Sequence, residues 1–472
     1  MNKPRLLVAA MALALSACAS PPTGQERLPL DLPEQWGTAA SQAPVASDWW
    51  RVFGDAQLDA LVNEALNGNT DLARAVARVD ESRAALRIAN ADRFPAVYGT
   101  ANASRARLSS IGRQPLPAST PAVNDAYSAS LNVQYEVDLW GRIANTARAA
   151  RADLLATEAA RDTVRLAVAS QAARSYFSLR ALDAAVDSTK RLLEAQRASL
   201  QLQRVRAQAG AISQFDLDRF EAEVAANESR LPTLENQRSQ AQTALAVLLG
   251  RSPRDVYTPR IERLESTMAR GPVAVVAAPA GLPSELLLRR PDIRVAEQNL
   301  AAADARVSAA RANYFPAIVL TGSLGSESAD LSSLFTGPAA VWSFAAALTQ
   351  PIFQAGRLFA QTDAALARQR QLEADYRNAV ATAFKEVRDA LTGVEQARLA
   401  FDAQTRRLEA LERARKLAQL RYENGYASQL DVIDADRQAL EAAIGQAEAE
   451  RDQRNAVVDM FRALGGGWAP AS

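Results

Sequence analysis

The chain has 472 residues, with 54 Lys and Arg against 53 Asp and Glu, one cysteine and no histidine. The balanced charge argues against a nucleic-acid partner, which would require an excess of basic residues. Metal sites built on His or Cys, Cys/His nucleophiles and Ser-His-Asp triads are excluded by this inventory. We therefore expect that the protein is not an enzyme and holds no metal or other cofactor.

The first 17 residues have the form of a secretory signal peptide. Two basic residues precede an apolar run over 6–15, which is too short to span a bilayer. The run ends in Leu-Ser-Ala-Cys at 15–18, which resembles a bacterial lipobox and implies cleavage before Cys18 and acylation of its thiol, with palmitate among the attached lipids. An ordinary cleavage site beside an incidental cysteine is the alternative. Ala19, rather than Asp, follows the cysteine and by analogy with other lipoproteins favours the outer membrane.

Residues 18–50 are rich in Pro, Ala and Ser and are predicted to form a lipidated N-terminal tether. Beyond residue 18, no apolar run approaches the roughly 20 residues that a transmembrane helix needs. If this chain enters a membrane, it must therefore do so with strands.

Short helices and strand-like intervals come next. We predict helices over 55–67 and 70–93, and Phe94-Pro95 ends the second because proline cannot continue a helix. Apolar and polar residues alternate without exception over 127–139, which predicts a strand, and a weaker pattern predicts its partner over 97–104. The second half of the chain repeats the arrangement, with a helix over 291–313 and strands over 317–325 and 342–351.

Strands of this kind fit either a half-buried sheet of a soluble protein or a transmembrane barrel. Long loops rich in Pro, Ser and Gly, together with aromatic residues near the strand ends (Tyr127, Trp140 and Trp342), favour the barrel. Four strands cannot close a barrel, because even the smallest membrane barrels need about eight and a bilayer tolerates no open sheet edge. We therefore expect that several copies of the chain share one barrel.

Residues 357–424 keep an apolar heptad in phase and contain almost no Gly and no Pro. One set of heptad positions reads Val380, Val387, Val394, Phe401, Leu408, Arg415 and Tyr422. The average spacing of 3.5 residues predicts a left-handed coiled coil, and a helix of about 68 residues would be on the order of 100 Å long.

The chain is a tandem duplication. A shift of 215 residues superimposes Gly356-Arg357 on Gly141-Arg142 and Gly425 on Gly210, and the heptad survives the shift. The predicted parts are a first structural repeat over 51–250 with a long hairpin over 141–250, an irregular connector over 251–283, a second repeat over 284–464 with a long hairpin over 356–464, and a C-terminal tail over 465–472.

The whole mature chain resembles the TolC-like outer-membrane efflux channels, specifically the NodT-type lipoprotein branch. The most specific string is GLPSELLLRRPDIR at 281–294, with support from Phe94-Pro95, Phe315-Pro316 and the segments 138–142, 350–353 and 421–425. The resemblance implies a mainly helical fold with membrane strands. Three copies would form one 12-stranded transmembrane β-barrel, continued into the periplasm by an α-barrel of helical hairpins.

The resemblance also implies a function in a tripartite efflux system. The homotrimer would pass drugs or other small solutes passively from an inner-membrane pump, of the proton-driven RND type, and its periplasmic adaptor to the outside. The alternative is a periplasmic coiled-coil adaptor or structural lipoprotein, which explains Cys18 and the heptads but not four amphipathic strands.

A gate is expected where the second hairpin turns back. Leu430, Asp434 and Arg437 fall at i, i+4 and i+7 on one helix face. By resemblance, Leu430 and Asp434 form rings at a periplasmic constriction and Arg437 helps to hold it closed. The alternative is a solvated helix face.

Four further residues are candidate gate or tip contacts. Phe215 and Asp216 align with Leu430 and Asp431, whereas Arg219 stands where Asp434 would be. Arg219 is therefore a candidate to pair with an acidic group on an adjacent hairpin. The turns at Gly210 and Gly425 are the candidate docking points for the adaptor.

Overall fold

The computed structural model describes residues 48–109, 121–259, 261 and 290–466. The signal peptide, Cys18, most of the predicted tether, most of the connector with residues 281–289, and the end of the tail lie outside these ranges. The described chain divides into two compact units, one made of 81–156 and 297–377 and the other of 48–80, 157–296 and 378–466.

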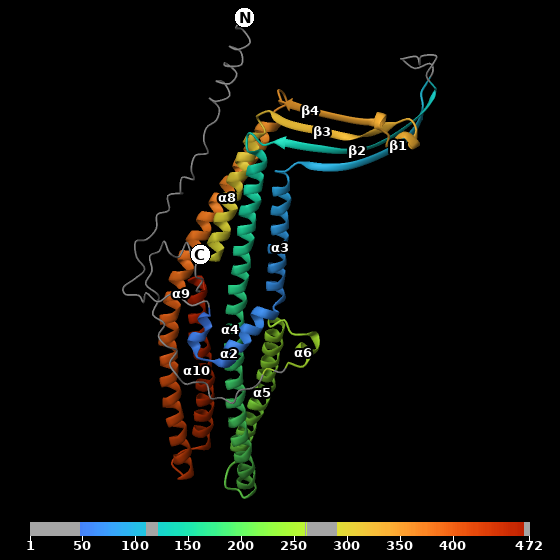
Figure 1. Ribbon diagram of the computed structural model, residues 1–472. Coiled ribbons are helices and arrows are strands. Elements are labelled where there is room, and N and C mark those ends of the chain that lie inside the picture. Colours follow the sequence, from blue (N-terminus) through green and yellow to red (C-terminus); the bar gives the residue numbers. More distant parts are fainter. Residues whose placement is uncertain (1–47, 110–120, 260, 262–289, 467–472) are drawn as a thin grey trace. The chain divides into compact units, whose positions relative to one another are not determined.

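The first unit contains a four-stranded antiparallel sheet in the order β1-β2-β3-β4 (Figure 1). The strands are β1 (Ala96–Arg107), β2 (Val123–Val137), β3 (Ala317–Ser328) and β4 (Ala340–Thr349). They lie where alternation predicts them, but all four predicted ranges are wrong at one end or at both. β2 begins at Val123 rather than 127 because β1 continues to Arg107 and pairs with it.

The ends of β2 and β4 next to the helices are set by local chemistry. β2 stops at Val137, before the predicted residue 139, because the Asp138 carboxylate accepts hydrogen bonds from the backbone N–H groups of Ile143 (3.1 Å) and Ala144 (2.7 Å) at the start of the next helix. β4 stops at Thr349, before the predicted residue 351, because Pro351 has no N–H to donate.

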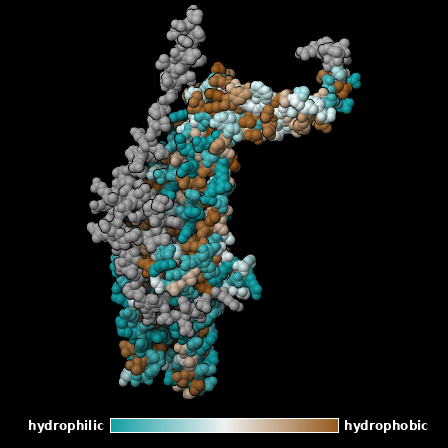
Figure 2. All heavy atoms as spheres, viewed as in Figure 1, coloured by the Kyte–Doolittle hydropathy of each residue, from teal (hydrophilic) through white to brown (hydrophobic). Residues whose placement is uncertain are grey.

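The register gives the sheet two different faces. The apolar face carries, among others, Val97, Leu131, Val133, Leu324, Trp342 and Phe344. On the polar face, the Thr100 and Ser130 hydroxyls are 2.9 Å apart, and the Asn132 amide donates to Thr100 (3.0 Å). Brown and pale side chains accordingly dominate the sheet in Figure 2. In the single chain, β1 and β4 are exposed on both faces, whereas most residues of β2 and β3 are half-buried.

The long helices of the two repeats have equal numbers of residues, as expected of a duplication. The helices are α2 (Ala56–Gly68), α3 (Thr70–Ala91), α4 (Arg142–Gln208), α5 (Gln214–Leu248), α6 (Pro253–Tyr257), α8 (Pro291–Ala312), α9 (Arg357–Glu423) and α10 (Gln429–Ala463). α4 and α9 each have 67 residues, α5 and α10 each have 35, and α3 and α8 each have 22.

The core of the second unit includes two residues that were predicted to lie in the tether. Trp49 and Trp50 are each 3% exposed in a 3-10 helix, and Trp49 stacks on Phe461 of α10 with ring centroids 5.4 Å apart. Burying two indoles outweighs the cost of ordering the chain there. The predicted connector is also not wholly irregular, because Pro253 begins α6 in the position that favours proline.

Equivalent clasps close the two repeats in the second unit. Asn69, just before α3, donates to the carbonyl of Leu248 at the end of α5 (2.8 Å). Arg290, just before α8, donates to the carbonyl of Ala463 at the end of α10 (2.8 Å). A cation at a helix C-terminus is favourable, so the second clasp adds electrostatic stabilisation to the hydrogen bond.

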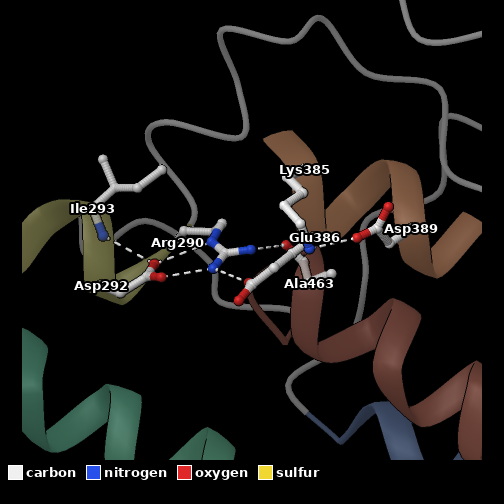
Figure 3. Close-up of polar contacts among 7 residues, drawn as sticks. All are labelled: Arg290, Asp292, Ile293, Lys385, Glu386, Asp389 and Ala463. Carbon is white, nitrogen blue, oxygen red and sulfur yellow. Dashed lines mark hydrogen bonds and ion pairs between the residues drawn. The ribbon is translucent and has the colours of Figure 1, made fainter. Parts of the chain in front are cut away.

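In the second clasp, the Arg290 side chain also contacts two carboxylates (Figure 3). Its side chain is 6% exposed, and one nitrogen lies 2.6 Å from both Asp292 and Glu386 of α9. Three helices are thus joined by one guanidinium, which explains the Arg-Pro-Asp part of the string at 281–294.

We expect Arg290→Met to lower the free energy of unfolding by about 3 kcal/mol, because it leaves two carboxylates and a carbonyl without their donor. Unfolding by urea, followed by tryptophan fluorescence, measures the change. Lys385→Met is the matched control, since Lys385 pairs with Asp389 at the surface of the same region. Equal loss of stability in both variants would contradict the clasp.

Candidate gate at the hairpin tips

Each long hairpin turns at a glycine with a left-handed backbone. Gly210 has φ +69° and Gly425 has φ +78°. The residue after each glycine donates its N–H to a carbonyl five residues back, from Ala211 to Arg206 and from Tyr426 to Arg421. This C-terminal motif ends α4 and α9 without leaving their last carbonyls unpaired.

The next helix begins at a serine cap in both repeats. Ser428 accepts from the N–H of Asp431 (3.3 Å), and the Asp431 carboxylate accepts from the N–H of Ser428 (2.8 Å). In the first repeat, Asp216 and Ser213 pair their side chains at 2.6 Å. Asp431 and Asp216 were predicted as possible gate contacts, and within the chain both are engaged in capping α10 and α5.

Leu430, Asp434 and Arg437 lie on α10 within the first three turns after the tip. The Leu430 side chain is 44% exposed. The Asp434 carboxylate accepts from Arg437 (2.7 Å) and from the Gln438 amide (2.5 Å). These hydrogen bonds, with that of Arg437 first, hold the pKa of Asp434 below its usual value of 3.8. Asp434 is therefore a carboxylate at neutral pH.

The first repeat has different side chains at the equivalent positions of α5. Phe215 is 67% exposed, and the Arg219 guanidinium lies over its ring, 5.5 Å from the centroid. Within the chain, Arg219 thus contacts its own helix. Its predicted pairing with an adjacent hairpin remains a prediction.

A contact between the two hairpins joins residues that were not predicted as site residues. The Tyr422 hydroxyl of α9 accepts from Arg206 (2.8 Å) and from Gln203 (3.1 Å) of α4. The Gln203 amide also donates to Gln429 of α10 (3.1 Å). Gln203 is 1% exposed, so these hydrogen bonds replace water that it cannot reach. A weak signal was present in the sequence, because the aliphatic heptad is interrupted near its end by Arg415 and Tyr422.

Further from the tips, other polar side chains lie between the helices. Gln196 of α4 and Asn227 of α5 are both buried, and the Asn227 amide donates to Gln196 at 3.0 Å. On α10, the pKa of Asp436 is raised, chiefly by burial. The positive charge of Arg415 offsets part of this rise, and the negative charge of Glu223 adds to it. Near their tips the two hairpins are therefore joined by the polar contacts of Gln203 and Tyr422 and by an apolar cluster, in which Ile433 of α10 packs against Leu193 of α4 and Phe220 and Val224 of α5.

None of the described helices contains a stretch that is both long enough and apolar enough to cross a membrane. A comparison with protein families identifies the chain. Residues 61–251 and 282–466 match the outer membrane efflux protein model. The chain belongs to the outer membrane efflux protein family. The two matched segments coincide with the two repeats.

Individual relatives agree with this assignment along the whole chain. Outer membrane protein OprJ of Pseudomonas aeruginosa is 35% identical, over 99% of this chain and 97% of its own. The probable outer membrane lipoprotein SilC of Salmonella typhimurium is 31% identical, over 99% of this chain and 100% of its own. The open-state MtrE outer membrane channel of Neisseria gonorrhoeae has a TM-score of 0.83 and 32% identity, over 95% and 98%.

This efflux protein is thus an outer-membrane channel of an efflux system, as its resemblance implies. The family assignment favours the channel over the alternative of a periplasmic adaptor or structural lipoprotein.

We expect Tyr422→Phe to loosen the hairpin tips of this efflux protein, because Arg206 and Gln203 lose their shared acceptor. Amide hydrogen exchange over 203–214 and 422–432 should become faster, with exchange around Trp49 unchanged. Tyr426→Phe is the matched control, because the Tyr426 side chain is exposed and only its backbone accepts from Arg421. Unchanged exchange in Tyr422→Phe would mean that the contact does not hold the hairpins together.

Proposed function

We propose that three copies of the chain form one closed conduit through the outer membrane. The observation that carries this proposal is the four-stranded sheet, which has one apolar face and two outer strands, β1 and β4, each with one neighbour. Unpaired backbone groups at those edges would cost several kcal/mol each in lipid. Pairing β1 of one copy with β4 of the next satisfies them, and three copies give the 12 strands that the family resemblance implies.

The dimensions of the sheet suit a bilayer. The apolar side of β2 runs from Tyr127 to Val137, which corresponds to about 36 Å of strand at 3.3 Å per residue. At the tilt of about 40° typical of membrane barrels, this length spans about 28 Å, close to the apolar band of about 25 Å. The polar face, with Thr100, Ser130 and Asn132, would then line the lumen.

The hairpins would continue the lumen into the periplasm, and solutes would pass by conduction rather than by catalysis. Energy would come from an inner-membrane pump, because the sequence has no phosphate-binding loop of the Walker type. The resemblance to the lipoprotein branch implies that this pump is of the RND type. The turns at Gly210 and Gly425 would contact the periplasmic adaptor. Acylated Cys18 would add a lipid anchor to the spanning strands.

The gate would close where three α10 helices approach the axis. Leu430 is exposed in the single chain, which leaves it available to pack against its copies. Three Asp434 carboxylates on a narrow axis would attract cations. Arg437 would keep them ionised despite their mutual repulsion, and the contact of Tyr422 with Gln203 and Arg206 would hold the hairpins in the closed arrangement.

Single-channel recording in planar bilayers tests this function. We expect Asp434→Asn to reduce cation selectivity, because it removes the carboxylates at the narrowest point, and Leu430→Ala to raise the conductance of the closed state. Glu423→Gln is the matched control, since Glu423 is bound by Gln419 on α9. A protein that forms no channels, or an Asp434→Asn variant with unchanged selectivity, would contradict the proposal.

The pH dependence separates two effects at Asp434. The lowered pKa means that its charge is lost only as the pH falls through a value below 3.8, so cation selectivity should persist from pH 7 to pH 5. In Arg437→Gln the stronger of the two lowering hydrogen bonds is gone and only that of Gln438 remains. Repulsion among the three carboxylates then raises the pKa, and selectivity should be lost at a higher pH than in the parent.

A further inference from the structure

The charged residues of the apolar face all lie at one end of the sheet. Val97, Gly99, Ala101 and Ala103 follow one another along β1 on this face, and Arg105 and Arg107 come next. On β2 the same face has Asp125 opposite Arg105, and then no charge from Tyr127 to Val137. On β3 and β4 it carries no charged residue. The charges are thus confined to the end of β1 and β2 that is remote from α3 and α4.

On the apolar face, two arginines against one aspartate leave this end positive, and Glu327 at the same end lies on the opposite face. Arg105 Nε is 3.5 Å from Asp125 Oδ1, and the Arg105 side chain is 75% exposed. Arg107 lies opposite Val123, at the last position of the strand, and is also exposed. An exposed pair at 3.5 Å contributes little to stability, so the arginines are available to another anion.

The position of these arginines relative to the apolar band is set by the register. Ala103 pairs with Tyr127, where the band begins. Arg105 and Arg107 lie two and four residues beyond Ala103, which is about 7 and 13 Å along the strand. With the tilt of a membrane barrel, they would stand about 5 and 10 Å beyond the hydrocarbon, at the level of lipid headgroups.

We propose that Arg105 and Arg107 bind the phosphate groups of the glycolipid that forms the outer leaflet of the outer membrane. This inference rests on the proposed function, which makes the apolar face the lipid-facing side and directs the ends of β1 and β2 outwards. The guanidinium fork matches phosphate oxygens and forms paired, charge-assisted hydrogen bonds with them. The alkyl parts of both side chains would lie on the apolar surface below.

The charge and the position of Arg105 and Arg107 identify their ligand. The cations face lipid rather than the lumen, which is lined by the opposite face. At this level the membrane itself supplies anions as the phosphate groups of the lipids of that leaflet. Asp125 acts against such binding, because it competes for Arg105 and repels phosphate.

Native mass spectrometry of the detergent-solubilised full-length protein, titrated with diphosphorylated lipid A at low ionic strength, tests the proposal. Each basic residue near an anionic lipid surface contributes about fivefold in affinity. Arg105→Gln with Arg107→Gln should therefore weaken binding about 25-fold, and Asp125→Asn should strengthen it. If Arg105 served only to pair with Asp125, Asp125→Asn would instead weaken binding or leave it unchanged.

The matched control is Arg87→Gln with Arg311→Gln, two exposed arginines of α3 and α8 with the same change of charge. Lipid A without phosphates should bind the parent as weakly as it binds the Arg105 and Arg107 double variant. Equal lipid A affinity in the parent and that variant, an equal loss in the control, or equally tight binding of phosphatidylglycerol would overturn the proposal.

Channel recording separates this inference from the function on which it rests. The Arg105 and Arg107 double variant should conduct like the parent, since neither arginine faces the lumen. A parent that conducts but binds lipid A independently of these arginines would overturn only the lipid site. A parent that forms no channels would contradict the proposed function itself.

Discussion

The structure depends on one constraint, which is that every backbone hydrogen bond inside a bilayer must be made within protein. A sheet of four strands with an apolar face meets this requirement except at β1 and β4. Those two edges are the reason for expecting further copies. In the proposed trimer, the polar face, the long helices and the hairpin tips would be repeated around one axis, and a single chain would carry one third of each.

The duplication preserves geometry more strictly than chemistry. Equivalent helices have equal lengths, and both tips use a left-handed glycine followed by a serine cap. At the equivalent positions, however, Asn69 is replaced by Arg290 in the clasps, and Asp434 by Arg219 beyond the tips. Equal lengths are needed for the helices of both repeats to reach the same height. The differences at the contact points allow the two hairpins to have unequal functions in a gate.

Much of the fold could be predicted because it follows local rules. The long helices, the duplication and the glycine turns come from periodicity and from single residues with special backbone preferences. The strand ends could not be predicted so well, since Asp138 caps a helix that begins beyond it and Arg107 pairs across a long loop. Trp49 and Trp50 were assigned to the tether because nothing near them in sequence indicates Phe461, on which Trp49 stacks.

In the candidate gate, too, the local features could be predicted from the sequence and the long-range contacts could not. The positions of Leu430, Asp434 and Arg437 on one face follow from helical spacing, and Arg437 does pair with Asp434. The capping of α10 by Asp431 is also a local pattern, but it competes with the assignment of that carboxylate to a gate. The contact of Gln203 with Tyr422 joins residues 219 apart. A broken heptad marks Tyr422, but only the folded chain identifies its partner.

The central claim is that the strands themselves hold the protein in the membrane and that three chains are needed to close them. Replacing Cys18 by Ser behind an ordinary cleavable signal removes the lipid and leaves the strands. Native mass spectrometry of this variant should find a protein that requires detergent and has the mass of three chains. A monomer or dimer that stays in solution without detergent would contradict the account, because its sheet would then need neither a bilayer nor further copies.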